Sequence, residues 1–268
     1  MKHPILLALG AGLMVLLVAL LLALVAPGRR QAGGAVAPAG QSLPWQAQAQ
    51  ADGSLQVLGL RLGHDRLADA QARIGDGLQV ALVARLGEVG RLEALADPFA
   101  AGFVSGRLVL AFDVPPATLA RWRSRATGSA PMDGGVRRFA LHAADRDEAQ
   151  RAALVGLSFL PALQLTEADV RQRFGAPVAE VALGAAGGAG VAGVWGAADA
   201  AQPGAKALLY PAIGLAVSVA PGRRCVLQYV APAEFEARLR APLVGPSAAS
   251  SPGAGAPDGA ESAQSPRV

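Results

Sequence analysis

The stretch LTEADVRQRFGAPVAEV, residues 165–181, holds a helix start, a helix stop and the beginning of a strand. Thr166 is the expected N-cap residue, and Asp169 follows three residues later in a pattern close to a capping box. Gly175 is expected to end the helix because glycine readily adopts positive φ, and the proline two residues later prevents the helix from resuming. The stretch therefore predicts a short capped helix, ending at Phe174, that leads directly into a strand.

Alternating apolar and polar residues continue the strand pattern after this helix. A Gly- and Ala-rich loop, about residues 184–206, interrupts the meander, and a last helix begins at Pro232. Strands are expected at 178–183, 207–210, 214–219 and 224–230. In the strand GLAVSV, alternate side chains point to opposite faces of the sheet. The residues expected to face the helix are Leu215, Val217 and Val219. The residues between them, Ala216 and Ser218, are expected to face solvent and to tolerate substitution.

The first half of the chain repeats this plan. The segment HDRLADAQARIG, residues 64–75, indicates a short helix that begins near Asp65 and ends at a glycine. Strands are expected at 78–86, 91–96, 106–114, 136–142 and 154–160, and further helices at 117–125 and 145–153. Antiparallel strands with one face covered by helices give an α+β fold. We therefore predict two tandem units, residues 52–127 and 128–242, each a helix followed by an antiparallel meander.

Three motifs of the second half resemble a known family: L-T-x-x-x-V-x-x-x-F-G-x-P, then L-Y-P-x-x-G-L-x-V-x-V, then V-L-Q-Y-V. They are similar to the β-lactamase-inhibitor-like fold, in particular to the small lipoproteins of the outer-membrane β-barrel assembly machine. The resemblance covers about residues 165–230, and residues 60–114 in outline. It implies a periplasmic interaction module. The matching residues are Leu165, Val170, Phe174, Gly175, Pro177, Tyr210, Gly214, Leu215, Val219 and Tyr229.

The N-terminal run ILLALGAGLMVLLVALLLALVA, Ile5–Ala26, carries no charged side chain. At about 1.5 Å per residue, a helix of this length crosses a hydrocarbon core about 30 Å thick. A cleaved signal peptide and a buried core helix are the alternatives. The nearest small-x-small cleavage sites are each followed by proline, however, and no polar face interrupts the run. We therefore predict a retained single-span transmembrane anchor, residues 1–27, followed by a linker, residues 28–51.

Charge alone does not orient this run, because Lys2 on one side and Arg29 with Arg30 on the other are nearly balanced. The resemblance favours a bacterial inner-membrane protein whose C-terminal domain lies in the periplasm. The chain lacks the lipobox cysteine of the resembled lipoproteins, so the anchor would be the helix. An envelope protein is the expected partner. The segment 243–268 is rich in Ser, Pro, Ala and Gly, and is predicted to be disordered.

The composition indicates neither nucleic-acid binding nor a cofactor. The formal net charge is +4, well short of a strongly basic domain. No phosphate-binding loop or dinucleotide fingerprint is present. His64 and His142 have no second histidine or cysteine at ligand spacing, so no metal site is expected. The single cysteine, Cys225, excludes an intrachain disulfide, and its apolar strand pattern indicates a buried, inert thiol.

Arginine residues gather around one tryptophan, on both sides of a Gly-rich loop. The functional interpretation is a patch that binds anionic lipid headgroups or an acidic protein. The alternative is a solvated helix face beside the outer side of a strand. The patch residues are Arg121, Trp122, Arg123, Arg125, Arg137 and Arg138.

The acidic residues Asp145, Asp147 and Glu148 are expected to stabilise a helix start rather than to form a catalytic pair. The predicted function is therefore a non-catalytic interaction module of the bacterial envelope. Two alternatives stay open: an envelope hydrolase with an acidic catalytic residue, and a membrane-bound regulatory domain that faces the cytoplasm.

Overall fold

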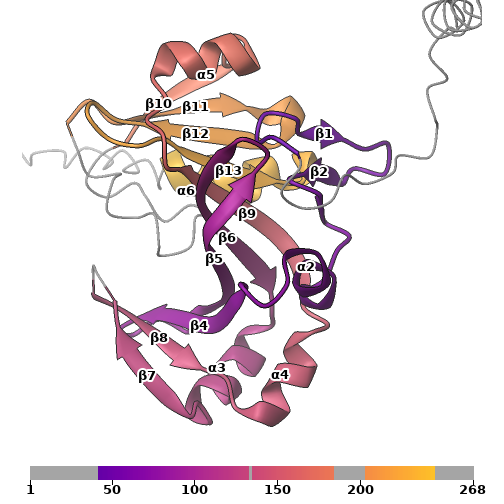
Figure 1. Cartoon of the computed structure of the whole chain (residues 1–268). Coiled ribbons are helices and arrows are strands. Elements are labelled where there is room, and N and C mark those ends of the chain that lie inside the picture. The colour runs from indigo at the N-terminus through magenta and orange to yellow at the C-terminus, as the bar shows by residue number, and fades with distance from the viewer. Residues whose placement is uncertain (1–41, 133–134, 184–202, 245–268) are drawn as a thin grey trace, which may run out of the picture. The chain divides into compact units, whose positions relative to one another are not determined.

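The computed structural model describes residues 42–132, 135–183 and 203–244 (Figure 1). Within these ranges every strand pairing is antiparallel, in a three-stranded and a ten-stranded sheet. The strands of the small sheet are β1 (Gln48–Ala49), β2 (Leu55–Val57) and β3 (Leu60–Leu62). The strands of the large sheet are β4 (Gln79–Arg85), β5 (Arg91–Ala101), β6 (Val104–Asp113), β7 (Gly128–Pro131), β8 (Val136–Ala140), β9 (Ala153–Pro161), β10 (Ala179–Ala182), β11 (Lys206–Tyr210), β12 (Leu215–Val219) and β13 (Val226–Val230).

Five α-helices, two 3-10 helices and one π-helix accompany the sheets in the part of the chain that is described. The α-helices are α2 (Leu67–Ile74), α3 (Pro116–Ser124), α4 (Ala143–Ala149), α5 (Glu167–Phe174) and α6 (Ala241–Val244). The 3-10 helices are Pro211–Ile213 and Pro232–Glu234, and the π-helix is Glu236–Arg240.

The large sheet joins two meanders through one strand. Its order is β10-β11-β12-β13-β9-β6-β5-β4-β8-β7. The strands β4 to β6 follow α2 along the chain, and β10 to β13 follow α5. Between them lies β9, in which Phe159 is opposite Leu108 of β6 on one side and Leu227 of β13 on the other. Both edges of β9 are therefore paired, and the two meanders form a single sheet.

The predicted fold class is wrong, because the described residues form a mixed α/β fold around one continuous sheet instead of two tandem units. The sequence pattern indicates the strands of each meander but not which other strands lie beside that meander. An unpaired strand edge pairs with whichever strand lies next to it in the fold. The strands β7 and β8 follow residue 127, yet β8 pairs with β4, where Phe139 is opposite Leu82. The sheet therefore continues across the expected unit boundary.

The segments predicted at the two ends of the chain fall largely outside the described residues. The expected anchor, residues 1–27, lies outside them, as do the expected linker up to residue 41 and the tail from residue 245. Among the residues that are described, no helix has the length and apolar character needed to cross a membrane. The last part of the expected linker is instead folded, because the carbonyl of Pro44 accepts a 2.6 Å hydrogen bond from the hydroxyl of Tyr229.

The main hydrophobic core lies between one face of the large sheet and several helices. Leu67 of α2, Trp122 of α3, Ala149 of α4 and Val170 of α5 all belong to this cluster. They meet a continuous layer of strand side chains, which includes Phe159 at the centre of the sheet. Burying a Leu, Val or Phe side chain stabilises a fold by about 1.5–3 kcal/mol, so this layer dominates the stability of the described residues.

A second cluster covers the opposite face at the β10 end of the sheet. There Phe235, Leu239 and Leu243 of the C-terminal helical segment pack with Leu209 and Ala216. Figure 1 shows α5 and α6 on opposite sides of the strands β10 to β12. The expectation that Ala216 faces solvent is therefore wrong, since this helical segment covers a face that the strand pattern alone leaves open.

The helix α5 forms as the sequence predicts. The hydroxyl oxygen of Thr166 accepts a hydrogen bond from the backbone N–H of Asp169, and the carboxylate of Asp169 accepts one from the N–H of Thr166. The helix ends at Gly175, where φ is +81° and ψ is −166°. Val217 of β12 lies in the core cluster that also contains Val170, as the alternation predicts.

Substitution of Gly175 tests this helix stop. An added Cβ meets no atom within 4 Å at Gly175, so any loss of stability from Gly175→Ala comes from the backbone conformation. The φ and ψ values lie in a region that only glycine adopts without strain, and we expect the free energy of unfolding to fall by about 1–3 kcal/mol. Gly77→Ala is the matched control, because Gly77 has equally open surroundings and no positive φ. Equal free energies from chemical denaturation of the two variants would contradict this account.

Candidate functional site

The predicted arginine patch is divided by the structure. Arg121, Arg123 and Arg125 lie on or directly after α3, and Arg137 and Arg138 lie on β8. Alternation along β8 places Phe139 opposite Leu82 and Arg138 opposite Val83, so these two residues point to opposite faces of the sheet. Arg138 is therefore separated from the α3 side of the sheet.

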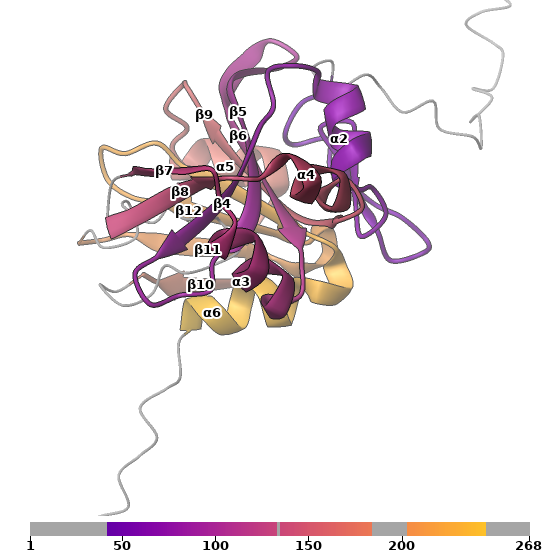
Figure 2. The ribbon, with the colours of Figure 1, turned by 90° about the horizontal axis from the view of Figure 1, so that it is seen from below.

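Trp122 is a core residue and not a surface contact. Its side chain is 1% exposed and belongs to the main hydrophobic cluster. The indole Nε1–H donates a 3.2 Å hydrogen bond to the carboxylate of Glu148 on α4. Trp122 thus fixes α3 beside α4, and the two helices lie next to each other at the bottom of Figure 1 and on the near side of the view in Figure 2.

Two of the five arginines are neutralised by acidic residues of α4. Arg121 pairs with Glu148 at 2.6 Å, and Arg125 pairs with Asp145 at 3.4 Å. The hydrogen bond from Arg121, together with that from the indole, lowers the pKa of Glu148. The carboxylate of Asp145 is almost fully buried. These acids therefore do more than stabilise a helix start, because they hold α3 and α4 together.

The other three arginines of the patch donate to neutral groups. Their positive charge is not neutralised by these contacts. Arg137 donates to the hydroxyl of Ser129 at 2.7 Å, and Arg138 donates to the side-chain oxygen of Gln79 at 3.3 Å. The guanidinium of Arg123 lies over the ring of Phe139, 5.0 Å from its centroid, and donates to the carbonyl of Glu88. Each guanidinium has five N–H donors, so donors remain for a partner.

A shallow groove lies beside Arg123, with a volume of 530 Å³. We call it the α3 groove, and its lining residues are Gly87, Glu88, Val89, Ala120, Arg123, Ser124 and Phe139. Val89 is 46% exposed, and Leu86, directly before the groove, is 92% exposed. The sequence shows Leu86 and Val89 as the end of a strand and part of a hairpin turn. Only the tertiary structure reveals that this turn lies against α3.

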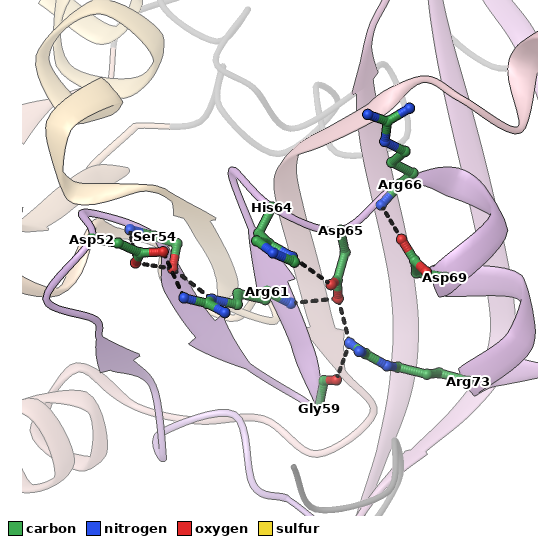
Figure 3. Close-up of polar contacts among 9 residues, drawn as sticks. All are labelled: Asp52, Ser54, Gly59, Arg61, His64, Asp65, Arg66, Asp69 and Arg73. Carbon is green, nitrogen blue, oxygen red and sulfur yellow. Dashed lines mark hydrogen bonds and ion pairs between the residues drawn. The ribbon is translucent and has the colours of Figure 1, made fainter. Parts of the chain in front are cut away.

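A second polar cluster surrounds the buried carboxylate of Asp65, which is 3% exposed (Figure 3). It accepts a 2.8 Å hydrogen bond from the backbone N–H of Arg61 and a further bond from the guanidinium of Arg73. Arg73 also donates to the carbonyl of Gly59 at 2.8 Å. His64 lies 3.5 Å from the same carboxylate, a distance that makes an ion pair only when the imidazole is protonated.

This cluster ties the β2–β3 hairpin to α2 and has a structural role. Asp65 does not cap the helix, although the sequence indicates that the helix begins near it. The N-cap residue is Arg66, and its backbone N–H donates a 2.8 Å hydrogen bond to the carboxylate of Asp69. On the outer side, the guanidinium of Arg61 extends the contacts to Asp52 at 2.6 Å.

The other residues that could act as a metal ligand or a nucleophile also have structural roles. Nδ1 of His142 accepts a 3.3 Å hydrogen bond from the N–H of Ala144 at the start of α4. Burial raises the pKa of the Cys225 thiol to about 12, so little nucleophilic thiolate exists at neutral pH. Within residues 42–132, 135–183 and 203–244, no three His, Cys, Asp or Glu side chains are placed to hold a metal ion.

None of the protein families, characterised proteins and solved structures compared with this chain matches it. The candidate site is therefore defined by its geometry. Of the features described, the α3 groove is the one that combines exposed apolar side chains with an arginine, Arg123, that donates to a carbonyl instead of an acid.

The structural role of Asp65 is tested by its isosteric amide. Asp65→Asn leaves the guanidinium of Arg73 without its buried carboxylate, and breaking such a pair costs about 3 kcal/mol or more of unfolding free energy. Asp52→Asn removes the exposed end of the same network, and we expect a much smaller loss because solvent screens that pair. Equal losses in chemical denaturation would show that the buried cluster does not hold the hairpin to α2.

Proposed function

We propose that this chain is a non-catalytic interaction module of the bacterial envelope, and that it binds an acidic protein segment in the α3 groove. One observation supports this most strongly: the guanidinium of Arg123 lies over the ring of Phe139 beside the exposed side chains of Val89 and Leu86. Arginine and aromatic residues are enriched at the centres of protein interfaces. Exposed apolar side chains that lie beside them favour the same use.

The charges around the groove favour an acidic partner. Arg123 and Arg137 lie on this side of the sheet and donate to a carbonyl and a hydroxyl, and neither forms an ion pair with another described residue. Glu88 lines the groove as well, and its backbone carbonyl accepts a hydrogen bond from Arg123. A carboxylate of a partner can therefore bind the remaining donors of Arg123 while its apolar neighbours contact Val89.

An acidic protein is favoured over an anionic membrane surface. Binding to anionic lipid relies on several basic side chains that reach the headgroups together. Here Arg121 and Arg125 are paired with acids of α4, and Arg138 points to the other face of the sheet. A groove lined by a single arginine, Arg123, is more suited to a shaped partner than to a flat surface.

Photo-crosslinking in cells tests the groove. A photoreactive residue at position 86 or 89 of the full chain is expected to crosslink one protein through an acidic segment, whereas one at the exposed Ala212 is not. Arg123→Glu should abolish the crosslink by charge repulsion. Arg151→Glu, the same charge change at an exposed site on the turn after α4, should leave it unchanged. Crosslinks to lipid alone, or equal crosslinking from position 212, would refute the proposal.

The location in the envelope is a separate part of the proposal, supported by the uncharged run Ile5–Ala26. A reporter that is active only outside the cytoplasm, fused after Gly245, is expected to be active. A reporter active only inside the cytoplasm, fused at the same site, is the control. If that control alone were active, the alternative of a cytoplasm-facing regulatory domain would replace the envelope assignment.

A further inference from the structure

We propose that a second site, at one end of the strands β5, β6 and β9, binds a small anion of the phosphate or carboxylate class. We call it the arginine cleft. Its volume is 430 Å³, which lies within the range of about 300–1,000 Å³ that is typical of small-ligand sites. The lining residues that carry the argument are Asp97, Ser105, Arg107, Arg223 and Arg224.

The cleft concentrates positive charge from two distant parts of the chain. Arg107 belongs to β6, whereas Arg223 and Arg224 belong to the turn between β12 and β13. Asp97 is the single acidic residue among the lining residues. Guanidinium groups that line one concave site raise the local concentration of anions and provide N–H donors for their oxygens.

Arg107 is held in place for such a ligand. Its Nε and Nη2 both lie 2.8 Å from the same oxygen of Asp97. This contact fixes the plane of the guanidinium and leaves the donors of Nη1 available. The side chain of Arg107 is 42% exposed, so a ligand can reach it from solvent. The hydroxyl of Ser105 adds a group that both donates and accepts hydrogen bonds.

Arg224 completes the site from the opposite side. It is exposed, and it makes no hydrogen bond or ion pair with any other residue of the described ranges. The exposed arginine of the turn and the fixed arginine of the strand line the same cleft, so both can donate to an anion that binds there. The arginine cleft shares no lining residue with the α3 groove, so this proposal does not depend on the proposed function.

Titration of the purified full chain with inorganic phosphate tests the cleft. We expect saturable binding in isothermal titration calorimetry, with an affinity that falls as sodium chloride is added. Arg107→Gln and Arg224→Gln should each weaken binding about tenfold, since each removes a charge-assisted hydrogen bond. Arg151→Gln, the same charge change at an exposed position outside the cleft, should alter the affinity less than Arg107→Gln or Arg224→Gln.

Asp97→Asn adds a test in which the affinity for phosphate is expected to rise instead of fall. Loss of the single acidic side chain in the cleft should tighten phosphate binding, a result that general destabilisation of the fold cannot produce. If Arg107→Gln fails to fold, Arg224→Gln in its exposed turn still decides the matter.

Co-sedimentation with vesicles identifies the source of the anion. The vesicles are phosphatidylcholine with and without phosphatidylglycerol. Binding of free phosphate that depends on Arg107 and Arg224 assigns a soluble anion. Binding to phosphatidylglycerol vesicles alone, with the same dependence, assigns a lipid headgroup, and both results uphold the cleft. Absence of saturable binding in both arms, or equal losses from Arg151→Gln and Arg224→Gln, would overturn the proposal.

Discussion

The pairing of β9 on both of its edges is the constraint on which the rest of the described structure depends. Without β9, the outer strand of each meander, β6 and β13, would present an open row of backbone donors and acceptors. The contact with β6 is close enough to require Gly106, because a Cβ there would overlap the carbonyl oxygen of Leu160 and the ring of Phe159. The joined sheet then provides a single continuous face on which four of the helices pack.

The two proposed binding surfaces lie at different places on this joined sheet. The arginine cleft combines a strand of the first meander with a turn of the second, so its two sides meet because β9 sets the meanders side by side. The α3 groove forms at the other end of β5, where the β4–β5 turn reaches the face that α3 covers. Neither surface is continuous in sequence, and each is positioned by rigid strands instead of by long loops.

Local features of the fold could be predicted from the sequence, because they depend on residues close to one another in the chain. The capping box of Thr166, the glycine stop at Gly175 and the inward position of Val217 are of this kind. The order of the strands could not be predicted, since the partner of a strand edge is chosen by packing over long distances. For the same reason the pattern placed Ala216 in solvent, although the helical segment that begins at Pro232 covers it.

The candidate site shows the same division. The sequence drew attention to α3 and β8, but charge spacing could not show that Trp122 is buried or that Glu148 and Asp145 neutralise two of the arginines. It gave no signal for the arginine cleft, whose two sides lie far apart in the chain.

The central place of β9 has a consequence for how the chain folds as it is made. Synthesis proceeds at about 5–20 residues per second, so β9 and β6 are complete for several seconds before β13 emerges. Through this interval one long edge of the sheet has no partner within the chain, and the hydroxyl of Tyr229 is not yet present to bind the carbonyl of Pro44. The first meander is thus a partly formed sheet until the second meander has been synthesised. During this time its open edge is most exposed to wrong pairing with neighbouring chains.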